Sequence, residues 1–193
     1  RELKNAALAH GLEFIATPFG VSDLKFLVDE LEVTTLKIAS GNLDNRALLH
    51  AAAHSPCHVL LSTGMAGMDE VKEAYSMFGL GRVTLLQCTS AYPTPPEEVN
   101  IRAMIDMGGE LKCRIGLSDH TLGSVAAVAA VGAGASVIEK HLTLDDTMDG
   151  PDHAASAEPA EFAAMVKNIR TAETMLGSRL KAPQPSEVQA VKI

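Results

Sequence analysis

Two histidines stand where two neighbouring apolar segments end, and their side chains are suited to binding a metal. His120 follows Asp119 in the chain, and His141 comes two residues after Glu139. If the segments are adjacent strands, the two imidazoles could meet and bind Mn, Zn or Fe while leaving positions open for substrate oxygens. Asp119 and Glu139 could orient the rings. Two ordinary buried histidines at strand ends are the competing interpretation.

Two lysines at strand ends suggest a different chemistry. Lys37 or Lys140 could form a Schiff base, as in metal-independent aldolases. Lys37 could equally be a point charge that binds a phosphate or carboxylate. Ser40 and Ser62, each followed within two residues by glycine, supply hydroxyls and exposed backbone N–H groups that suit a phosphate. These residues leave the choice between an imine and an anion site open.

Three further features carry weaker signals. Asp152 lies in a long loop that Pro151 stiffens, which indicates a held carboxylate. His50 and His54 lie four residues apart on one predicted helix face, but they have no third ligand nearby, so we expect an ordinary helix end. Cys88 has no triad partners around it and is expected to pack in a strand.

The elements that must position these residues repeat along the chain. Short apolar runs, roughly 20 to 30 residues apart, alternate with helical patterns, which is typical of βα units and a parallel sheet. The sequence contains neither G-x-G-x-x-G nor a P-loop, which counts against the usual nucleotide-binding open sheets. Nearly every run ends in reactive groups, and a closed barrel brings such ends to one face. The predicted strands lie at 14–16, 36–38, 59–61, 83–87, 114–116 and 136–139.

The expected helices follow the apolar spacing of the intervening segments. The pattern at 24–31 predicts a helix with Ser22 as its N-cap. Gly108 and Gly109 are expected to end another helix, as are Gly11 and Gly134 for theirs. The predicted helices lie at 2–9, 24–31, 47–52, 68–77, 101–107, 125–131 and 162–176.

Composition limits the function classes. The 193 residues carry a formal net charge of -8, with 47% hydrophobic and 21% charged residues. This acidity, without a basic run, argues against nucleic-acid binding. No apolar stretch approaches the ~20 residues that a membrane span needs. Three cysteines without a C-x-x-C pair favour a reducing, cytoplasmic location.

Six polar segments follow one another along the chain: Leu36-Lys37-Ile38-Ala39-Ser40-Gly41, Leu61-Ser62-Thr63-Gly64-Met65-Ala66, Cys88-Thr89-Ser90-Ala91-Tyr92-Pro93-Thr94-Pro95, Gly116-Leu117-Ser118-Asp119-His120-Thr121, Ile138-Glu139-Lys140-His141 and Gly150-Pro151-Asp152-His153. Together and in this order they resemble the N-acetylneuraminate (sialic acid) synthase family, and the resemblance runs from about Gly11 to Val191. It implies an α/β fold, a (β/α)8 TIM barrel represented here by about six βα units, strands 3 to 8, within residues 1–181. Residues 182–193 would be a linker toward a C-terminal antifreeze-like domain. Both ends look cut, and the first two βα units would precede Arg1.

The resemblance also implies an activity and roles for the residues. Members of this family condense phosphoenolpyruvate with N-acetylmannosamine or a related amino sugar, with a divalent metal such as Mn or Mg, and the full-length protein is expected to be a homodimer. By resemblance, His120 and His141 are the metal ligands, and Lys37, Glu139 and Asp152 are the catalytic residues. Phosphoenolpyruvate would contact Lys37 and four serines, while Tyr92, Glu139 and Asp152 would lie near the sugar. The four serines are Ser40, Ser62, Ser90 and Ser118.

Some choices stay open at this stage. Some family members carry Asn where Ser90 stands and an acidic residue where Asn42 stands, so the identity of the sugar is open. N-acetylneuraminate, legionaminate, pseudaminate and 9-phosphate synthases all remain candidates. Outside the family, the alternatives are a Schiff-base lysine aldolase or lyase and a non-catalytic sugar-phosphate-binding barrel.

Overall fold

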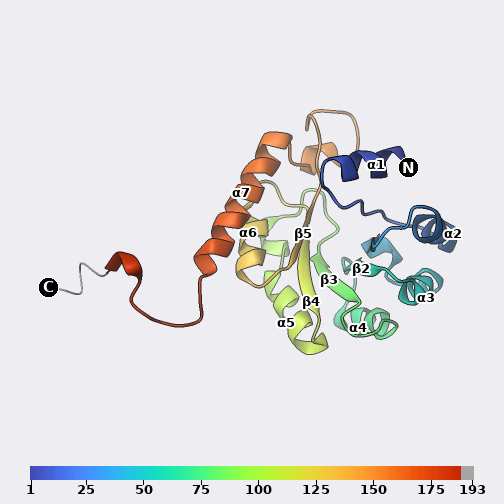
Figure 1. Ribbon diagram of the computed structural model, residues 1–193, viewed down its shortest axis with the longest axis horizontal. Coiled ribbons are helices and arrows are strands. Elements are labelled where there is room, and N and C mark those ends of the chain that lie inside the picture. The colour runs from blue at the N-terminus through green and yellow to red at the C-terminus, as the bar shows by residue number, and fades with distance from the viewer. Residues whose placement is uncertain (188–193) are drawn as a thin grey trace.

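The computed structural model describes residues 1–187 and contains one curved sheet of five parallel strands (Figure 1). The strands pair in chain order, each with the next, as the βα repeat predicts. This confirms a parallel α/β architecture. The strands are β1 (Thr35–Ile38), β2 (His58–Ser62), β3 (Val83–Cys88), β4 (Arg114–Asp119) and β5 (Val137–Lys140).

The first of the six predicted strands, at 14–16, is reduced to a single bridge. Ala16 pairs with Leu36 of β1, and the amide of Lys37 donates to the Ala16 carbonyl over 3.1 Å. The pairing goes no further because Pro18, two residues on, has no N–H to donate. The prediction of a full strand at 14–16 was wrong.

Helices alternate with the strands and form an arc around the sheet (Figure 1). Two predicted helix ends were wrong. Gly20, not Ser22, is the N-cap of α2, and Gly108 and Gly109 lie inside α5, which ends at Lys112 in the left-handed conformation. The helices are α1 (Glu2–Ala9), α2 (Val21–Lys25) with a π-helical turn (Phe26–Glu30), α3 (Arg46–His54), α4 (Met68–Ser76), α5 (Ile101–Leu111), α6 (Val125–Gly132) and α7 (Pro159–Leu176).

Alternation along each strand divides the side chains between two faces. Successive residues of a strand point to opposite sides of the sheet. Leu36 and Ile38 of β1 are fully buried in the hydrophobic core against the helices, and Lys37 between them therefore faces the other way. The same rule applies to Leu61 and Ser62 of β2. One face of the sheet is apolar and supports the helices, and the opposite face carries polar groups at the strand ends.

A glycine lets β4 and β5 approach closely. A Cβ added at Gly116 would lie 2.4 Å from the Val137 carbonyl oxygen, which no real side chain tolerates. The neighbouring pairs Ser118 with Glu139 and Asp119 with Lys140 are in register across these two strands. Gly116 therefore allows close packing between the two strands that lead to His120 and His141.

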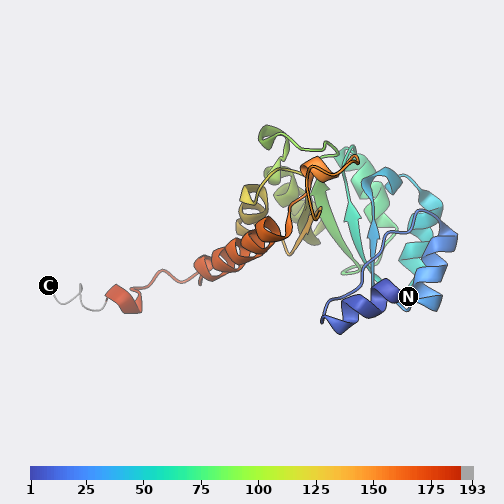
Figure 2. The same cartoon turned by 90° about the horizontal axis from the view of Figure 1, so that it is seen from above.

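The C-terminal part of the described chain leads away from the sheet. Helix α7 packs against α6, and the following segment extends from the body to a short 3-10 turn, Pro185–Glu187 (Figure 2). The predicted linker at 182–193 includes 188–193, which lie outside the described residues. Within residues 1–187, no helix is long and apolar enough to cross a membrane.

Candidate active site

A cavity of about 630 Å³ opens at the carboxyl ends of the strands. The chain contributes to it from every strand, because the strands are parallel and their carboxyl ends share one edge. Of the ten residues predicted for the site, all but Asp152 line this cavity. They are Lys37, Ser40, Ser62, Ser90, Tyr92, Ser118, His120, Glu139 and His141.

The two histidines face each other across the β4–β5 boundary. Their ring centroids are 5.2 Å apart and the rings are nearly perpendicular. Nδ1 of His120 lies 2.9 Å from the Thr89 carbonyl oxygen, so Nδ1 carries the proton there and Nε2 is left for a ligand. The rings therefore offer imidazole nitrogens at one place, a donor set that fits a divalent transition metal.

The pKa values of the two rings move in opposite directions. Burial lowers the pKa of His120, but hydrogen bonds to the Cys88 thiol and the Thr89 carbonyl outweigh it, and the net pKa is raised. The pKa of His141 is lowered, first by burial and then by the neighbouring charge of His120. A lowered pKa keeps His141 in the neutral form that metals bind.

Tyr92 covers both imidazoles. Its ring centroid is 4.1 Å from that of His120 and 5.5 Å from that of His141. Burial, together with the charges of Cys88, Asp152 and Glu139, raises the pKa of the Tyr92 hydroxyl, which therefore stays protonated at neutral pH. Tyr92 can both shield the histidine pair and donate a hydrogen bond to a ligand.

Lys37 and Glu139 form a charged pair inside the cavity. Lys37 Nζ lies 3.6 Å from Glu139 Oε1 and donates to the Ile38 carbonyl over 3.0 Å. Ser118 Oγ donates to the same Glu139 oxygen over 2.6 Å. Burial lowers the pKa of Lys37, and the Glu139 carboxylate acts against this by favouring the charged amine. Because Lys37 also lines the cavity, its amine can interact with an anionic ligand there in addition to Glu139.

A ring of hydroxyls and a backbone amide lies beside Lys37. The Gly64 amide donates to Ser40 Oγ over 2.9 Å. A Cβ on Gly64 would lie 2.5 Å from Ser90 Oγ and 2.8 Å from Ser40 Oγ, so only glycine allows this approach. Ser62 Oγ is buried and has no hydrogen-bond partner among the described residues. A buried hydroxyl without a partner is costly unless a ligand supplies one.

Asp152 stands at the rim of the cavity. Its Oδ2 lies 3.7 Å from His141 Nδ1, and more than half of the side chain is exposed. Ser156 Oγ donates to the Asp152 carbonyl over 2.7 Å, and His153 Nδ1 is 2.7 Å from Thr143 Oγ1. These contacts hold the loop, so the carboxylate is positioned as its sequence context indicated.

Asp119 and Lys140 do not line the cavity. Lys140 Nζ lies 2.9 Å from Asp119 Oδ2, and both side chains are almost completely buried. The expectation that Asp119 contacts and orients the histidine rings directly was wrong, because alternation turns its side chain away from His120 and toward Lys140 and Thr121. Lys140 is for the same reason removed as a Schiff-base candidate.

Several lining residues were missed or judged differently from the sequence. Cys88 was expected to be only a packed strand residue, but its side chain lines the cavity, and its thiol helps to raise the pKa of His120. Leu85 faces the helices, and Cys88, three residues later on the same strand, must face the other side. Strand alternation could therefore have placed Cys88 in the cavity. Thr17, Phe19, Ala39, Gly41 and Met65 also line the cavity.

A separate hollow of about 350 Å³ lies beside this cavity, between the starts of α3 and α4. It contains an exposed ion pair, Arg46 with Glu73, and two further carboxylates, Asp44 and Glu70. It contains no histidine and none of the predicted site residues except Ser40. The cavity above the strand ends is therefore the candidate site.

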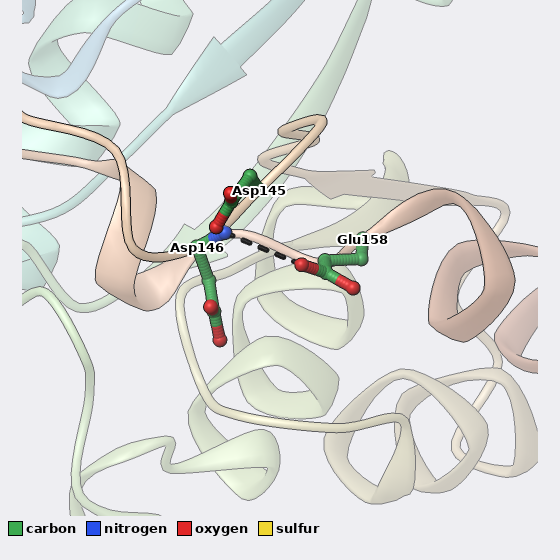
Figure 3. Close-up of side chains that lie close together, drawn as sticks. All are labelled: Asp145, Asp146 and Glu158. Atoms are coloured by element: carbon green, nitrogen blue, oxygen red, sulfur yellow. Dashed lines mark hydrogen bonds between the residues drawn. The ribbon is translucent and has the colours of Figure 1, made fainter.

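Three carboxylates elsewhere lie close enough together to suggest a cation (Figure 3). They belong to Asp145, Asp146 and Glu158. Asp145 Oδ1 already accepts from the amide and hydroxyl of Thr147 over 2.8 and 2.6 Å, and Glu158 Oε1 accepts from the Asp146 amide over 3.4 Å. These contacts are those of a loop closing on itself, so the histidine pair remains the better metal candidate.

His50 and His54, the rival pair from the sequence, make helix contacts. Their rings lie 4.2 Å apart, and His54 Nδ1 is 2.8 Å from the His50 carbonyl oxygen. Both side chains are exposed on α3, away from the residues of the cavity. This agrees with the expected ordinary helix end.

Comparisons with known proteins point to one family. The chain matches the model of the NeuB family over residues 1–181. It is 47% identical to an uncharacterized protein, MJ1065, of Methanocaldococcus jannaschii, over 96% of this chain and 56% of that protein. It is 40% identical to the N,N'-diacetyllegionaminic acid synthase of Legionella pneumophila, over 96% of this chain and 54% of that enzyme. The chain therefore spans little more than half the length of these relatives.

A solved structure agrees in fold. The N-acetylneuraminic acid (sialic acid) synthetase of Leptospira borgpetersenii, crystallised with citrate, superposes with a TM-score of 0.91 at 37% identity. The match covers 99% of this chain and 67% of that one.

Proposed function

We propose that this chain, which belongs to the NeuB family, is part of an enzyme that condenses phosphoenolpyruvate with an N-acetylated amino sugar to give a nonulosonic acid and phosphate. The observation that carries the proposal is the composition of one cavity. It combines a buried cation, a group of hydroxyls with one lacking a partner, and a pair of imidazoles. A condensation of an anionic phosphate ester with an aldehyde needs a cationic subsite for the ester and, beside it, a subsite where a metal would polarise the aldehyde.

The phosphoenolpyruvate subsite would be built around Lys37. Its ammonium, the orphaned Ser62 hydroxyl and the hydroxyls of Ser40 and Ser90 can together bind the phosphate oxygens. Because Lys37 is buried, water screens its charge little, and the attraction for a dianion is strong. These groups would bind and orient the enol ester and stabilise the phosphate as it leaves.

The histidine pair would hold the divalent metal, Mn or Mg. When bound there, the metal supplies Lewis-acid polarisation of the sugar aldehyde. Neutral His141 and the Nε2 atom of His120 are the donor atoms suited to it. Tyr92, packed over both rings, would limit the access of water to this subsite.

The carboxylates would move protons and hold the sugar. The enol carbon of phosphoenolpyruvate forms the new bond to the aldehyde carbon, and the aldehyde oxygen gains a proton. Water then adds at C2, and the C–O bond to phosphate breaks. Glu139, which accepts from Ser118 and lies near Lys37, would take the proton of that water, and Asp152 at the rim would hold a sugar hydroxyl.

The test is an assay on the intact protein. Phosphate release from phosphoenolpyruvate is measured with Mn and, in separate reactions, with N-acetylmannosamine, its 6-phosphate and a diacetylated diamino sugar. We expect release with one of these acceptors, equimolar formation of a nonulosonic acid, and loss of both with EDTA. Release that survives EDTA unchanged, or no turnover with any acceptor despite ligand binding, would contradict the proposal. The second outcome would favour a non-catalytic sugar-phosphate-binding barrel.

One observation favours a second candidate function, a Schiff-base aldolase or lyase. Burial lowers the pKa of Lys37, and a lowered pKa makes an amine a better nucleophile at neutral pH. The carboxylate of Glu139 3.6 Å away opposes this by favouring the ammonium. Borohydride reduction with a carbonyl substrate, followed by mass analysis of the peptide that contains Lys37, separates the two functions.

A further inference from the structure

The buried ion pair behind the cavity plays no part in the proposed chemistry and requires its own explanation. Asp119 and Lys140 are the side chains of one register pair between β4 and β5. Their side chains are 0% and 2% exposed, and Lys140 Nζ lies 2.9 Å from Asp119 Oδ2. Charged residues are rarely buried so completely, because desolvation costs about as much as the pairing returns.

The pair is held by further contacts on both sides. Asp119 Oδ1 accepts from the amide and the hydroxyl of Thr121 over 2.9 and 2.8 Å, and Lys140 Nζ also donates to the Thr121 carbonyl. The two charges and the backbone that follows His120 therefore form one closed network. Both carboxylate oxygens of Asp119 have partners in it, and the Lys140 ammonium has two, so its geometry is narrow.

The position of the pair in the ladder suggests what it does. The last two register pairs of β4 and β5 carry cross-strand contacts on opposite faces of the sheet. Ser118 Oγ donates to Glu139 on the cavity face, and Asp119 pairs with Lys140 on the other face. The rings of His120 and His141, directly after the two strands, meet on the cavity side. The ion pair is therefore the last register pair before the histidines.

A slip in register would break this arrangement. One residue along a strand is about 3.3 Å and reverses the face of every side chain. After such a slip Asp119 would face Glu139 or His141 instead of Lys140, and a buried carboxylate would lose its cation. Leu117 and Ile138 on the same face would leave the core in the same slip, and the unpaired carboxylate adds to that penalty.

We propose that the Asp119–Lys140 ion pair is a positioning device that sets the register of β4 and β5, so that His120 and His141 meet as one metal site. The metal site itself rests on the proposed function. The pair contributes little to the free energy of folding, because a neutral pair of equal size would pack as well. Its effect lies in the separation and direction of the two imidazoles.

The test compares a neutral pair with a charged one in the intact protein. Asp119→Asn with Lys140→Met keeps the shape, and the Asn oxygen still accepts from Thr121. Lys140→Arg keeps the charge. Removing the exposed pair of Lys72 and Glu110, by Lys72→Met with Glu110→Gln, is the matched control.

Two readouts are used, and one of them needs no metal. Electron paramagnetic resonance titration measures the Mn affinity, and NMR of the metal-free protein measures the nuclear Overhauser effect between the two imidazoles. We expect the neutral pair to melt like the unchanged protein, to bind Mn about 10- to 100-fold more weakly and to lose the inter-ring effect. Lys140→Arg and the surface control should retain both.

The outcomes separate the two ideas. A neutral pair that retains the inter-ring effect and Mn affinity overturns the positioning role, and so does one that fails to fold, because the ion pair would then act by stabilising the chain. If the unchanged protein binds no Mn, the proposed metal site is wrong. In that case the inter-ring effect alone decides whether the ion pair sets the register.

Discussion

Replacing Lys37 by alanine tests the phosphoenolpyruvate subsite most directly. The substitution removes a buried ammonium that lies 3.6 Å from Glu139 and lines the same cavity as Ser62, whose hydroxyl has no hydrogen-bond partner within residues 1–187. A hydrogen bond between charged groups in such a place contributes about 2–3 kcal/mol. At 1.4 kcal/mol for each factor of ten, the Kd of phosphoenolpyruvate should rise roughly 30- to 140-fold.

The upper half of that range is expected because the substitution also changes Glu139. The Glu139 carboxylate loses its cation, and its negative charge then faces the incoming dianion without compensation. Lys25→Ala, an exposed lysine on α2, is the control for a simple change in net charge and should leave the Kd unchanged.

The pH dependence has a definite sign. Only the ammonium attracts the phosphate, so the affinity falls as pH rises through the pKa of Lys37. Since burial lowers that pKa, the fall should begin at a lower pH than an exposed lysine would give. In the Lys37→Ala protein this fall in phosphoenolpyruvate affinity with rising pH should disappear.

The assay is isothermal titration of the intact protein with phosphoenolpyruvate across a pH series, with circular dichroism to confirm folding. A folded Lys37→Ala protein with unchanged affinity would refute the electrostatic role. A borohydride-reduced adduct on Lys37 would replace that role with Schiff-base chemistry.

Three further predictions concern the metal site, the serine cluster and the sheet. His141→Ala should abolish Mn-dependent turnover and weaken Mn binding; full activity and affinity in this variant would remove His141 as a ligand. Gly64→Ala puts a methyl group 2.5 Å from Ser90 Oγ, so the binding free energy of phosphoenolpyruvate should weaken by about 1–3 kcal/mol, and an unchanged Kd in titration calorimetry would contradict this. Thermal melts should show Gly116→Ala destabilised by at least about 1–3 kcal/mol, because its Cβ meets a strand carbonyl at 2.4 Å. Gly109→Ala, in open space on α5, should instead stabilise by about 0.5–1 kcal/mol, and equal melting temperatures for the two would count against the packing argument.

Much of the site could be predicted from the sequence because strand alternation is local. A polar residue between two leucine-like neighbours in a short buried strand must face away from the helices, which places Lys37 correctly. Parallel pairing then brings all strand ends to one edge, so the histidines and serines share a cavity. The same rule, applied strictly, also turns Asp119 and Lys140 away from the cavity.

Other features depend on contacts between distant segments, and local spacing could not reveal them. The close approach of Gly64 to Ser90 joins two loops 26 positions apart in the numbering. Asp152 reaches His141 only because His153 meets Thr143 across a long loop. The segment 14–16 likewise pairs with β1 through the single bridge of Ala16 with Leu36, because the pairing stops before Pro18.

The sequence by itself determined the βα order, the family and the types of group gathered at the strand ends, because these follow from period-two alternation and from motifs along one chain. Only the tertiary structure decided which of those groups touch. It made Asp119 and Lys140 a buried pair behind the histidines, and within residues 1–187 it left the Ser62 hydroxyl without a hydrogen-bond partner. Such pairings depend on register and on the approach of neighbouring strands within a few ångströms, and neither is encoded in the spacing of residues along a strand.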